Sequence, residues 1–200
     1  MKIVVLADDD AFETIRLTNT QAIWIQVADA NSFTQHDEAD AFFDLTYHAI
    51  TTQHPVLNKP LFINSVIYSL PAGKKAIRIN GWKGFLENNL WEVSGDISNA
   101  DQSILSYLNK KIIVCNDEPG FVSPRIIAMI INEAYYAKGE GVSTEEEIDI
   151  AMKLGTNYPY GPFEWAHKIG VDHIYNLLKK LSLSDSRYQP SPLLTKTATS

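Results

Sequence analysis

The hydrophobic pattern of this chain changes at Gly120, and that change limits the possible folds more than any other feature. Before Gly120, short runs rich in β-branched and aromatic residues alternate with weaker helical segments. Seven runs are predicted to be strands: Lys2–Leu6, Ala22–Val27, Ala41–Thr46, Pro60–Ile67, Ala76–Asn80, Leu90–Val93 and Lys111–Cys115. Strands separated by helical stretches indicate an α/β domain with a mostly parallel sheet.

Two segments between these strands have helical signals. Ala11–Leu17 fits a short helix. Ser98–Leu108 fits a better one, because Ser98 is suited to be its N-cap and Asp101 stands in the capping-box position.

The sequence after Gly120 has only helical patterns. A helix is predicted at Pro124–Ala137, where apolar residues recur on one face and proline is tolerated in the first turn. Ser143–Glu146 is interpreted as a capping box that begins a second helix, which Gly155 ends.

Two further helices are predicted, at Pro162–Ile169 and Asp172–Leu181. No strand is expected in residues 121–200, and the polar end Thr195–Ser200 is expected to fray. We therefore expect two domains, residues 1–118 and 119–200, joined by a hinge at Asp117–Val122.

Charge and composition exclude several kinds of partner. The net charge is −7 and the chain has no basic cluster, so we expect no nucleic-acid partner. No apolar run approaches the roughly 20 residues that cross a bilayer, so no membrane association is expected. The single cysteine, Cys115, excludes an intrachain disulfide and fits a reducing cytoplasm, where we expect the protein to reside.

Three motifs in the helical half occur in one order and at one spacing. They are Pro119-Gly-Phe-Val122, the turn Asn157-Tyr-Pro-Tyr-Gly-Pro-Phe-Glu-Trp165, and Tyr188-Gln-Pro-Ser-Pro-Leu-Leu194. Together they resemble the C-terminal domain of the 3-hydroxyacyl-CoA dehydrogenases. The resemblance extends over residues 109–194 and is limited to scattered islands in residues 1–108.

The resemblance implies a fold and an activity. The fold is a reduced Rossmann-like α/β domain followed by an all-helical domain of 3-hydroxyacyl-CoA dehydrogenase type. The family reaction is the NAD-dependent oxidation of a 3-hydroxyacyl-CoA in fatty-acid metabolism. The helical domain makes the dimer in this family, so a homodimer is expected here.

The cofactor turn of the family is altered in this chain. The glycines of GxGxxG let a backbone approach the pyrophosphate at a helix N-terminus. Their positions fall at Ala7, Asp9 and Phe12, none of which is glycine. Asp8, Asp9 and Asp10 would repel phosphate, so we predict a capped helix rather than a dinucleotide site. Asp29 matches the acid that binds the ribose of NAD, as a weak cofactor-binding candidate.

The catalytic residues implied by the resemblance are incomplete. Trp82 occupies the place of the histidine that accepts the substrate's proton, and an indole is a donor only. Leu90-Trp-Glu-Val93 matches the motif of the glutamate that orients this histidine, so Glu92 is the remaining catalytic candidate.

The substrate-binding positions are also changed. Tyr68 stands in a serine position of the family, Pro124 in an asparagine position, and Ser69 and Ser123 are possible substitutes. The five histidines lack HxH or HxxxH spacing, so no metal site is expected.

These residues leave three hypotheses for function. The first is a degenerate family member with impaired or no catalysis, retained as a dimer or an acyl-CoA sensor. The second is an active dehydrogenase with a rearranged site, in which Tyr68, Ser69 or His36 is the base. The third is a non-catalytic interaction module that binds no small molecule.

Overall fold

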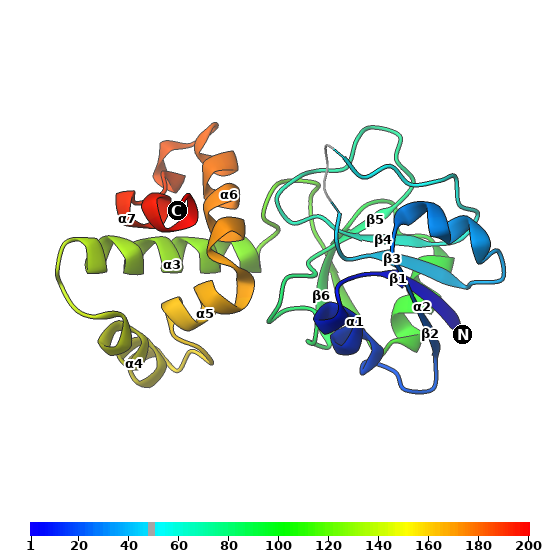
Figure 1. Cartoon of the computed structure of the whole chain (residues 1–200), viewed down its shortest axis with the longest axis horizontal. Coiled ribbons are helices and arrows are strands. Elements are labelled where there is room, and N and C mark those ends of the chain that lie inside the picture. The colour runs from blue at the N-terminus through cyan, green and yellow to red at the C-terminus, as the bar shows by residue number, and fades with distance from the viewer. Residues whose placement is uncertain (48–50) are drawn as a thin grey trace. The chain divides into compact units, whose positions relative to one another are not determined.

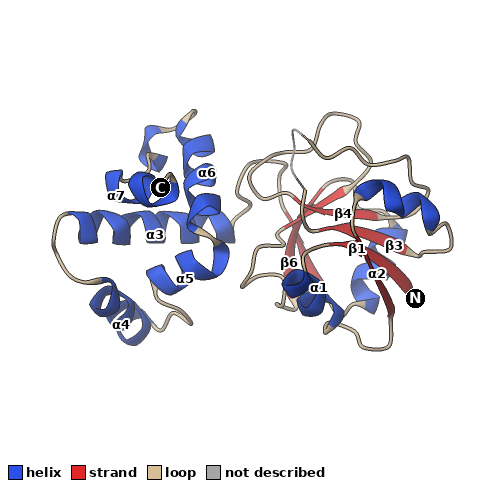
Figure 2. Ribbon diagram, viewed as in Figure 1, coloured by secondary structure: helices blue, strands red, loops and turns tan. Residues whose placement is uncertain are grey.

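The structure is a computed structural model that describes residues 1–47 and 51–200. The chain forms two compact units, Met1–Phe121 and Val122–Ser200 (Figure 1). The first contains the strands, and the second consists of helices and loops throughout its described length (Figure 2). The change of pattern at Gly120 therefore separates two kinds of architecture, as predicted.

A single sheet organises the first unit. Among the described residues it has seven strands in the order β2-β1-β3-β4-β5-β6-β7. Their bounds are β1 Lys2–Leu6, β2 Ile23–Val27, β3 Ala41–Asp44, β4 Leu61–Asn64, β5 Ile77–Ile79, β6 Leu90–Ser94 and β7 Lys111–Val114. Neighbouring strands are parallel except for β5 and β6, which are antiparallel. The mostly parallel α/β sheet is confirmed.

The strand order reverses between β1 and β3. β2 lies on one side of β1, while β3 and every later strand follow on the other side. The crevice at the carboxyl ends of such strands is where open α/β sheets bind ligands. In this chain β1 ends at Leu6 and β3 ends at Asp44, so a ligand-binding site is expected at this edge of the sheet.

The two faces of the sheet are covered differently. Helices α1 (Asp9–Arg16) and α2 (Asn99–Tyr107) pack on one face, where Ile15 and Leu105 are buried with alternate residues of the strands. The other face is covered by a short 3-10 helix, η1 (Ala30–Gln35), and by loop residues. Among the described residues, this face has no long helix of the kind that covers both faces of a doubly wound fold.

The helix ends follow the capping signals in the sequence. Ser98 accepts a 3.2 Å hydrogen bond from the N–H of Asp101, whose carboxylate accepts one of 2.8 Å from the N–H of Ser98. This reciprocal pair is the predicted capping box of α2.

The second unit is built around the long helix α3. Its elements are α3 Ser123–Gly139, α4 Glu145–Thr156, α5 Pro162–Ile169, α6 Val171–Ser182, the 3-10 helix η2 Ser186–Tyr188, and α7 Pro192–Ala198. Helices α5, α6 and α7 all pack on α3. Ile127, Ile131 and Ala134 are buried in this core, whereas Ile126 is 55% exposed. Most of the apolar face predicted on α3 is therefore covered within its own unit.

The ends of α4 differ from the prediction. Thr144 rather than Ser143 is the N-cap, and it forms the capping box with Glu147. Ser143 instead donates a 2.5 Å hydrogen bond from its hydroxyl to the Glu147 carboxylate. Gly155 lies inside the helix, which ends at Asn157 in the left-handed region with φ 58°. Asparagine tolerates this conformation, so it ends the helix in place of glycine.

The C-terminal residues are helical where fraying was expected. Ser191 is the N-cap of α7 and accepts a 3.1 Å hydrogen bond from the N–H of Leu194. The buried Asn132 of α3 accepts from the N–H of Ser191 at 2.8 Å and donates to the carbonyl of Gln189 at 3.0 Å. A side chain some 60 positions upstream therefore holds this terminus in place.

Candidate functional site

The turn between β1 and α1 is filled by the chain's own carboxylates. Asp8 is the N-cap of α1, and its carboxylate accepts a 2.7 Å hydrogen bond from the N–H of Ala11. Asp9 accepts a 3.0 Å hydrogen bond from the side chain of Gln26 on β2. The predicted capped helix is confirmed, because these acids serve the helix end and the sheet edge.

Asp10 has a cationic partner from a different loop. The Lys83 ammonium lies 2.7 Å from its carboxylate, and this hydrogen bond raises the pKa of Lys83. A basic side chain at this edge is thus already paired with an acid of the chain. The family resemblance implies NAD as the cofactor. Three carboxylates, with Lys83 already paired with Asp10, do not fit its negatively charged pyrophosphate.

Asp29 follows β2 and caps the 3-10 helix η1. Its carboxylate accepts a 3.0 Å hydrogen bond from the N–H of Ser32. The acid that matches the ribose-binding position therefore has a structural role as a helix cap in this chain.

Trp82 and Glu92 lie near the carboxyl end of β5. Trp82 is 6% exposed and follows Gly81, whose N–H donates a 3.0 Å hydrogen bond to the side chain of Asn64. Glu92 is 7% exposed and accepts a 3.1 Å hydrogen bond from the side-chain amide of Asn80. The structure thus pairs the candidate glutamate with an amide, which cannot relay a proton as an imidazole does.

The candidate substrate residues belong to two different units. Tyr68 and Ser69 lie in the loop after β4, where Ser69 donates a 2.9 Å hydrogen bond to the backbone carbonyl of Asp117. The Tyr68 carbonyl accepts a 2.7 Å hydrogen bond from Ser65, and its side chain is 39% exposed. Ser123 is the first residue of α3 in the second unit.

Arg78 was not singled out from the sequence, yet it holds the end of the first unit. It lies in β5 with 1% exposure and donates 2.8 Å and 2.9 Å hydrogen bonds to the carbonyls of Ser65 and Glu118. It also forms an ion pair with Asp117 and packs over the Phe121 ring at 4.4 Å. Burial lowers the pKa of Arg78, which Asp117 partly opposes. The sequence signal for a buried role of Arg78 was a charged residue within an apolar strand.

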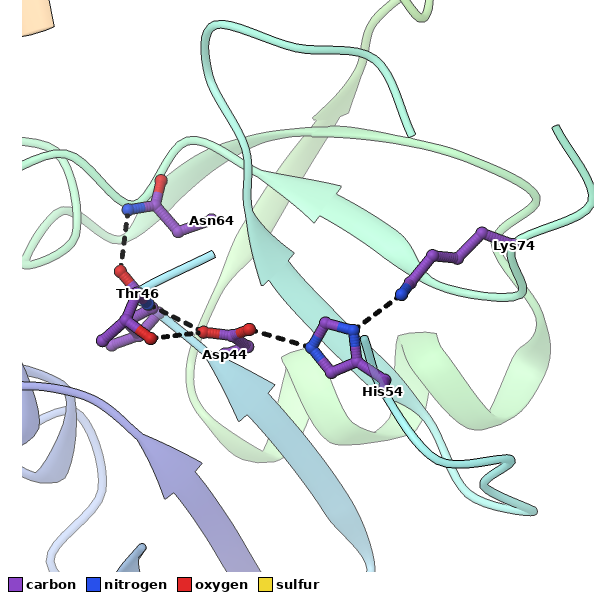
Figure 3. A network of polar contacts seen from close by, with 6 residues as sticks. Asp44, Thr46, His54, Asn64 and Lys74 are labelled. Carbon is purple, nitrogen blue, oxygen red and sulfur yellow. Dashed lines mark hydrogen bonds and ion pairs between the residues drawn. The ribbon is translucent and has the colours of Figure 1, made fainter. Parts of the chain in front are cut away.

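A second set of titratable residues lies at the carboxyl end of β3, and sequence reasoning missed it. The buried Asp44 carboxylate lies 2.8 Å from Nε2 of His54, and Nδ1 of His54 lies 2.6 Å from the Lys74 ammonium (Figure 3). Thr46 donates to the other oxygen of Asp44 from its N–H at 2.8 Å and from its hydroxyl at 3.0 Å. The sequence signal was an aspartate at the end of an apolar strand.

In the second unit, the N-terminus of α5 is capped from another helix. The buried Asp149 of α4 accepts hydrogen bonds from the N–H groups of Phe163 and Glu164, at 2.8 Å and 3.1 Å. Glu164 also pairs with Lys153 and accepts a 2.9 Å hydrogen bond from the N–H of Gly161. These contacts fix the turn between α4 and α5.

The described residues contain no group of three or more His, Cys, Asp or Glu side chains placed to hold a metal ion. In the same part of the chain, no helix has the length and apolar character needed to cross a membrane.

Comparison with known proteins identifies the second unit. Residues 120–200 match the family model described as the 3-hydroxyacyl-CoA dehydrogenase C-terminal domain. A 3-hydroxybutyryl-CoA dehydrogenase of Bradyrhizobium diazoefficiens is 43% identical over 99 residues, which are 48% of this chain and 34% of that protein. A probable 3-hydroxybutyryl-CoA dehydrogenase of Bacillus subtilis is 46% identical over 91 residues, 44% of this chain and 32% of that protein.

Residues 120–200 therefore belong to the C-terminal domain family of the 3-hydroxyacyl-CoA dehydrogenases. The match spans about a third of the length of these curated relatives. The resemblance predicted from the three motifs is confirmed for the helical unit.

Solved structures extend the likeness to the fold of the whole chain. The (S)-3-hydroxybutyryl-CoA dehydrogenase of Ralstonia eutropha superposes with a TM-score of 0.73, covering 99% of this chain and 93% of that one at 19% identity. A 3-hydroxybutyryl-CoA dehydrogenase from Escherichia coli gives a TM-score of 0.60 at 30% identity, covering 72% of this chain and 32% of that one. A Rossmann-like domain followed by a helical domain is therefore the fold of this chain, as it is of these solved structures.

Proposed function

We propose that this family member does not catalyse NAD-linked oxidation of a 3-hydroxyacyl-CoA and is retained as a dimer-forming, acyl-CoA-binding protein. One observation carries the proposal. The Asp8 carboxylate occupies the N-terminus of α1 and accepts the N–H of Ala11 that a phosphate would need.

Electrostatics at this turn support the proposal. Asp8, Asp9 and Asp10 are consecutive, and Lys83 is paired with one of them. Two like unit charges 4 Å apart repel by about 1 kcal/mol in water and about 4 kcal/mol near a protein surface. A pyrophosphate at the end of α1 would meet this repulsion and would also have to displace the Asp8 cap.

The residue in the base position gives independent support. Oxidation of a hydroxyl to a ketone requires a group that takes the hydroxyl proton while the hydride leaves. The buried Trp82 stands where the family has its histidine, and its indole N–H has no lone pair for a proton. A loss of both the phosphate turn and the base is what a non-catalytic member would show.

We place a truncated NAD-binding-type domain at residues 1–118 and the helical domain at residues 119–200. Exposed apolar side chains on α4 support a homodimer through the helical domain. Ile150 and Leu154 are 45% and 83% exposed and lie one helical turn apart, so they share a face. A pair of copies would cover this face.

Isothermal titration with NADH and then with acetoacetyl-CoA tests the proposal. We expect no heat from NADH and a saturable signal from acetoacetyl-CoA. NADH binding at micromolar strength, or NADH consumption with acetoacetyl-CoA present, would contradict the loss of catalysis. Silence with both ligands would contradict acyl-CoA binding and leave dimerisation alone. Sedimentation velocity tests the dimer, and Leu154→Glu is expected to shift it to monomer.

A further inference from the structure

The contacts among Asp44, His54 and Lys74 have the order of a nucleophile, a base and an orienting acid. The Lys74 ammonium has only N–H donors, so Nδ1 of His54, 2.6 Å away, accepts from it. The other nitrogen of the ring therefore carries its proton and donates to Asp44 over 2.8 Å. An activated nucleophile is recognised by such a base, which a third group orients (Figure 3).

Burial makes this arrangement rigid. The side chains of His54 and Asp44 are 2% and 0% exposed, and the imidazole stacks against the rings of Phe33 and Tyr47, with centroids 6.2 Å and 5.8 Å away. Thr46 fixes the Asp44 carboxylate through two hydrogen bonds. The imidazole thus has one orientation, with Nδ1 directed at Lys74.

Lys74 is the member of this set that adjoins an exposed turn. It lies in the turn after β4, is half-buried, and follows the exposed residues Ala72 and Gly73. Burial lowers the pKa of the Lys74 amine, although the charge of Asp44 acts in the opposite direction. The side chain of His54, which contacts the amine, is buried, so a reagent would have to reach the amine from the exposed turn.

We propose that Lys74 is a nucleophilic amine that accepts an acyl group from a thioester, with His54 as its base and Asp44 as the positioning residue. This site lies in the first unit and does not rest on the proposed function, because reversible acyl-CoA binding is not required for acylation of Lys74. A thioester suits a site with a single base, because a departing thiolate needs less help from an acid than an alkoxide or amine does.

The proposed step conserves atoms and charge. One ammonium proton passes to Nδ1 of His54, which frees the lone pair of the amine to attack the carbonyl carbon. The C–N bond forms as the C–S bond breaks, and the sulfur leaves with the bonding electrons. The second proton lost by nitrogen goes to this thiolate, so the products are an amide on Lys74, a free thiol and a His54 imidazolium paired with Asp44.

Tyr47 lies beside Lys74. The Lys74 ammonium lies 5.6 Å from the centroid of its ring. Its hydroxyl is buried and has no hydrogen-bond partner among the residues that the structure describes. Burial raises the pKa of this hydroxyl, and the charge of Asp44 adds to the effect, so it stays protonated and can donate to a developing oxyanion.

Lys75 provides a control within the same molecule, because it is exposed and adjacent to Lys74. The purified full chain would be incubated with acetyl-CoA, cut with a protease that does not cleave at lysine, and analysed by fragmentation mass spectrometry. We expect Lys74 to be acetylated at least about tenfold faster than Lys75. This ratio is below the roughly 100-fold or greater acceleration that a positioned general base typically contributes. Equal rates at the two lysines would overturn the proposal.

His54→Gln separates the base from the scaffold. The glutamine amide can still donate to Asp44 but cannot take a proton from Lys74, so the rate ratio of Lys74 to Lys75 should fall to about one. An unchanged ratio in a folded variant would remove His54 from the mechanism. If the variant unfolds, the ratio of the Lys74 and Lys75 rates in the unsubstituted protein still tests the proposal, because that measurement needs no substitution.

A short thioester that lacks the nucleotide, N-acetylcysteamine acetate thioester, identifies what is recognised. Preferential reaction of Lys74 with both reagents supports recognition of the thioester alone. Reaction with acetyl-CoA alone supports the same nucleophile with an added contribution from the nucleotide. Reaction with neither contradicts the proposal, whether or not titration detects acyl-CoA binding.

Discussion

The carboxylate of Asp8 accepts a 2.7 Å hydrogen bond from the N–H of Ala11 at the first turn of α1. This turn follows β1, beside the point where the strand order of the sheet reverses. In open α/β sheets that point is where a phosphate meets a helix N-terminus. Here an acid of the chain satisfies the helix end, so stability and cofactor binding compete for the same N–H groups.

Asp8→Ala is expected to lower the free energy of unfolding by about 1 kcal/mol, because an N-cap acceptor is lost. Asp8→Asn is the matched control, since its side-chain oxygen can still accept from Ala11 and asparagine is an equally good N-cap. Urea denaturation followed by tryptophan fluorescence measures both. Equal losses in the two variants would show that charge, rather than the cap, stabilises this turn.

Arg78→Met is expected to destabilise the first unit by about 2–3 kcal/mol, because two backbone carbonyls lose a buried charged donor. The carbonyls are those of Ser65 and Glu118. Asp117→Asn tests the ion pair separately and should cost about 1 kcal/mol or less, because its carboxylate is 49% exposed. Urea denaturation of both variants measures the difference. A larger loss from Asp117→Asn would assign the stability to the ion pair instead.

The strands could be predicted because their signal is local. β1 was predicted with its observed bounds, and the other six differ by a few residues at their ends. Alternate residues of β1 face different sides of the sheet, with Ile3 and Val5 in one core and Val4 and Leu6 in the other. A strand buried on both faces reads as a continuous apolar run, which the sequence displays directly.

Helix ends were predictable only in part, because adjacent residues can compete to cap a helix. The capping box of Ser98 with Asp101 was predicted correctly, although Asn99 is adjacent. Ser143 and Thr144 are adjacent and can both cap a helix. Thr144 is the N-cap of α4 because Glu147, three positions later, forms the capping box with it. Helix α7 depends on Asn132, whose contact with Ser191 crosses 59 positions and leaves no local pattern.

The candidate site was predictable in part for the same reason. The Asp8 cap depends on neighbours in the sequence, and it was predicted. His54 reaches Asp44 through a loop without periodicity, and Lys74 reaches His54 from a different turn. Loop conformations of this kind are set by tertiary contacts, so the sequence showed three separate titratable residues where the structure has one connected set.

Gly161→Ala is expected to destabilise the helical unit by about 2–3 kcal/mol, as overpacking of a filled core does. A Cβ at this position would lie 2.2 Å from Cγ of Asp149, the residue that caps α5. Gly155→Ala is the control within α4, because nothing lies within 4 Å of its added Cβ. This control should stabilise the unit by about 0.5–1 kcal/mol, since alanine is the better helix former. Thermal unfolding followed by circular dichroism measures both, and losses of similar size would show that the Asp149 contact is not limiting.

Lys110 makes the stability of the first unit depend on pH in the alkaline range. It is 6% exposed and donates to the carbonyls of Leu86 and Asn88 at 3.0 Å and 2.7 Å, and burial lowers its pKa to about 8. Below that pH the amine is charged in both the folded and unfolded states, so the folded state bears the full cost of burying the charge. As the pH rises from about 8 towards the unfolded value of about 10.4, the folded state loses its proton first, and the free energy of unfolding increases.

Lys110→Met isolates this effect, because methionine keeps much of the packing against the Trp91 ring and does not titrate. The free energy of unfolding of the unsubstituted protein, relative to the variant, should rise by about 2 kcal/mol between pH 7.5 and pH 10, given about 1.4 kcal/mol for each unit of pKa difference. Comparing the two proteins at each pH cancels the contributions of the other titratable groups, which both proteins share. Urea denaturation over this range measures the difference. A difference that stays constant would mean that Lys110 titrates alike in the folded and unfolded chains, and a difference that falls would reverse the sign of its pKa shift.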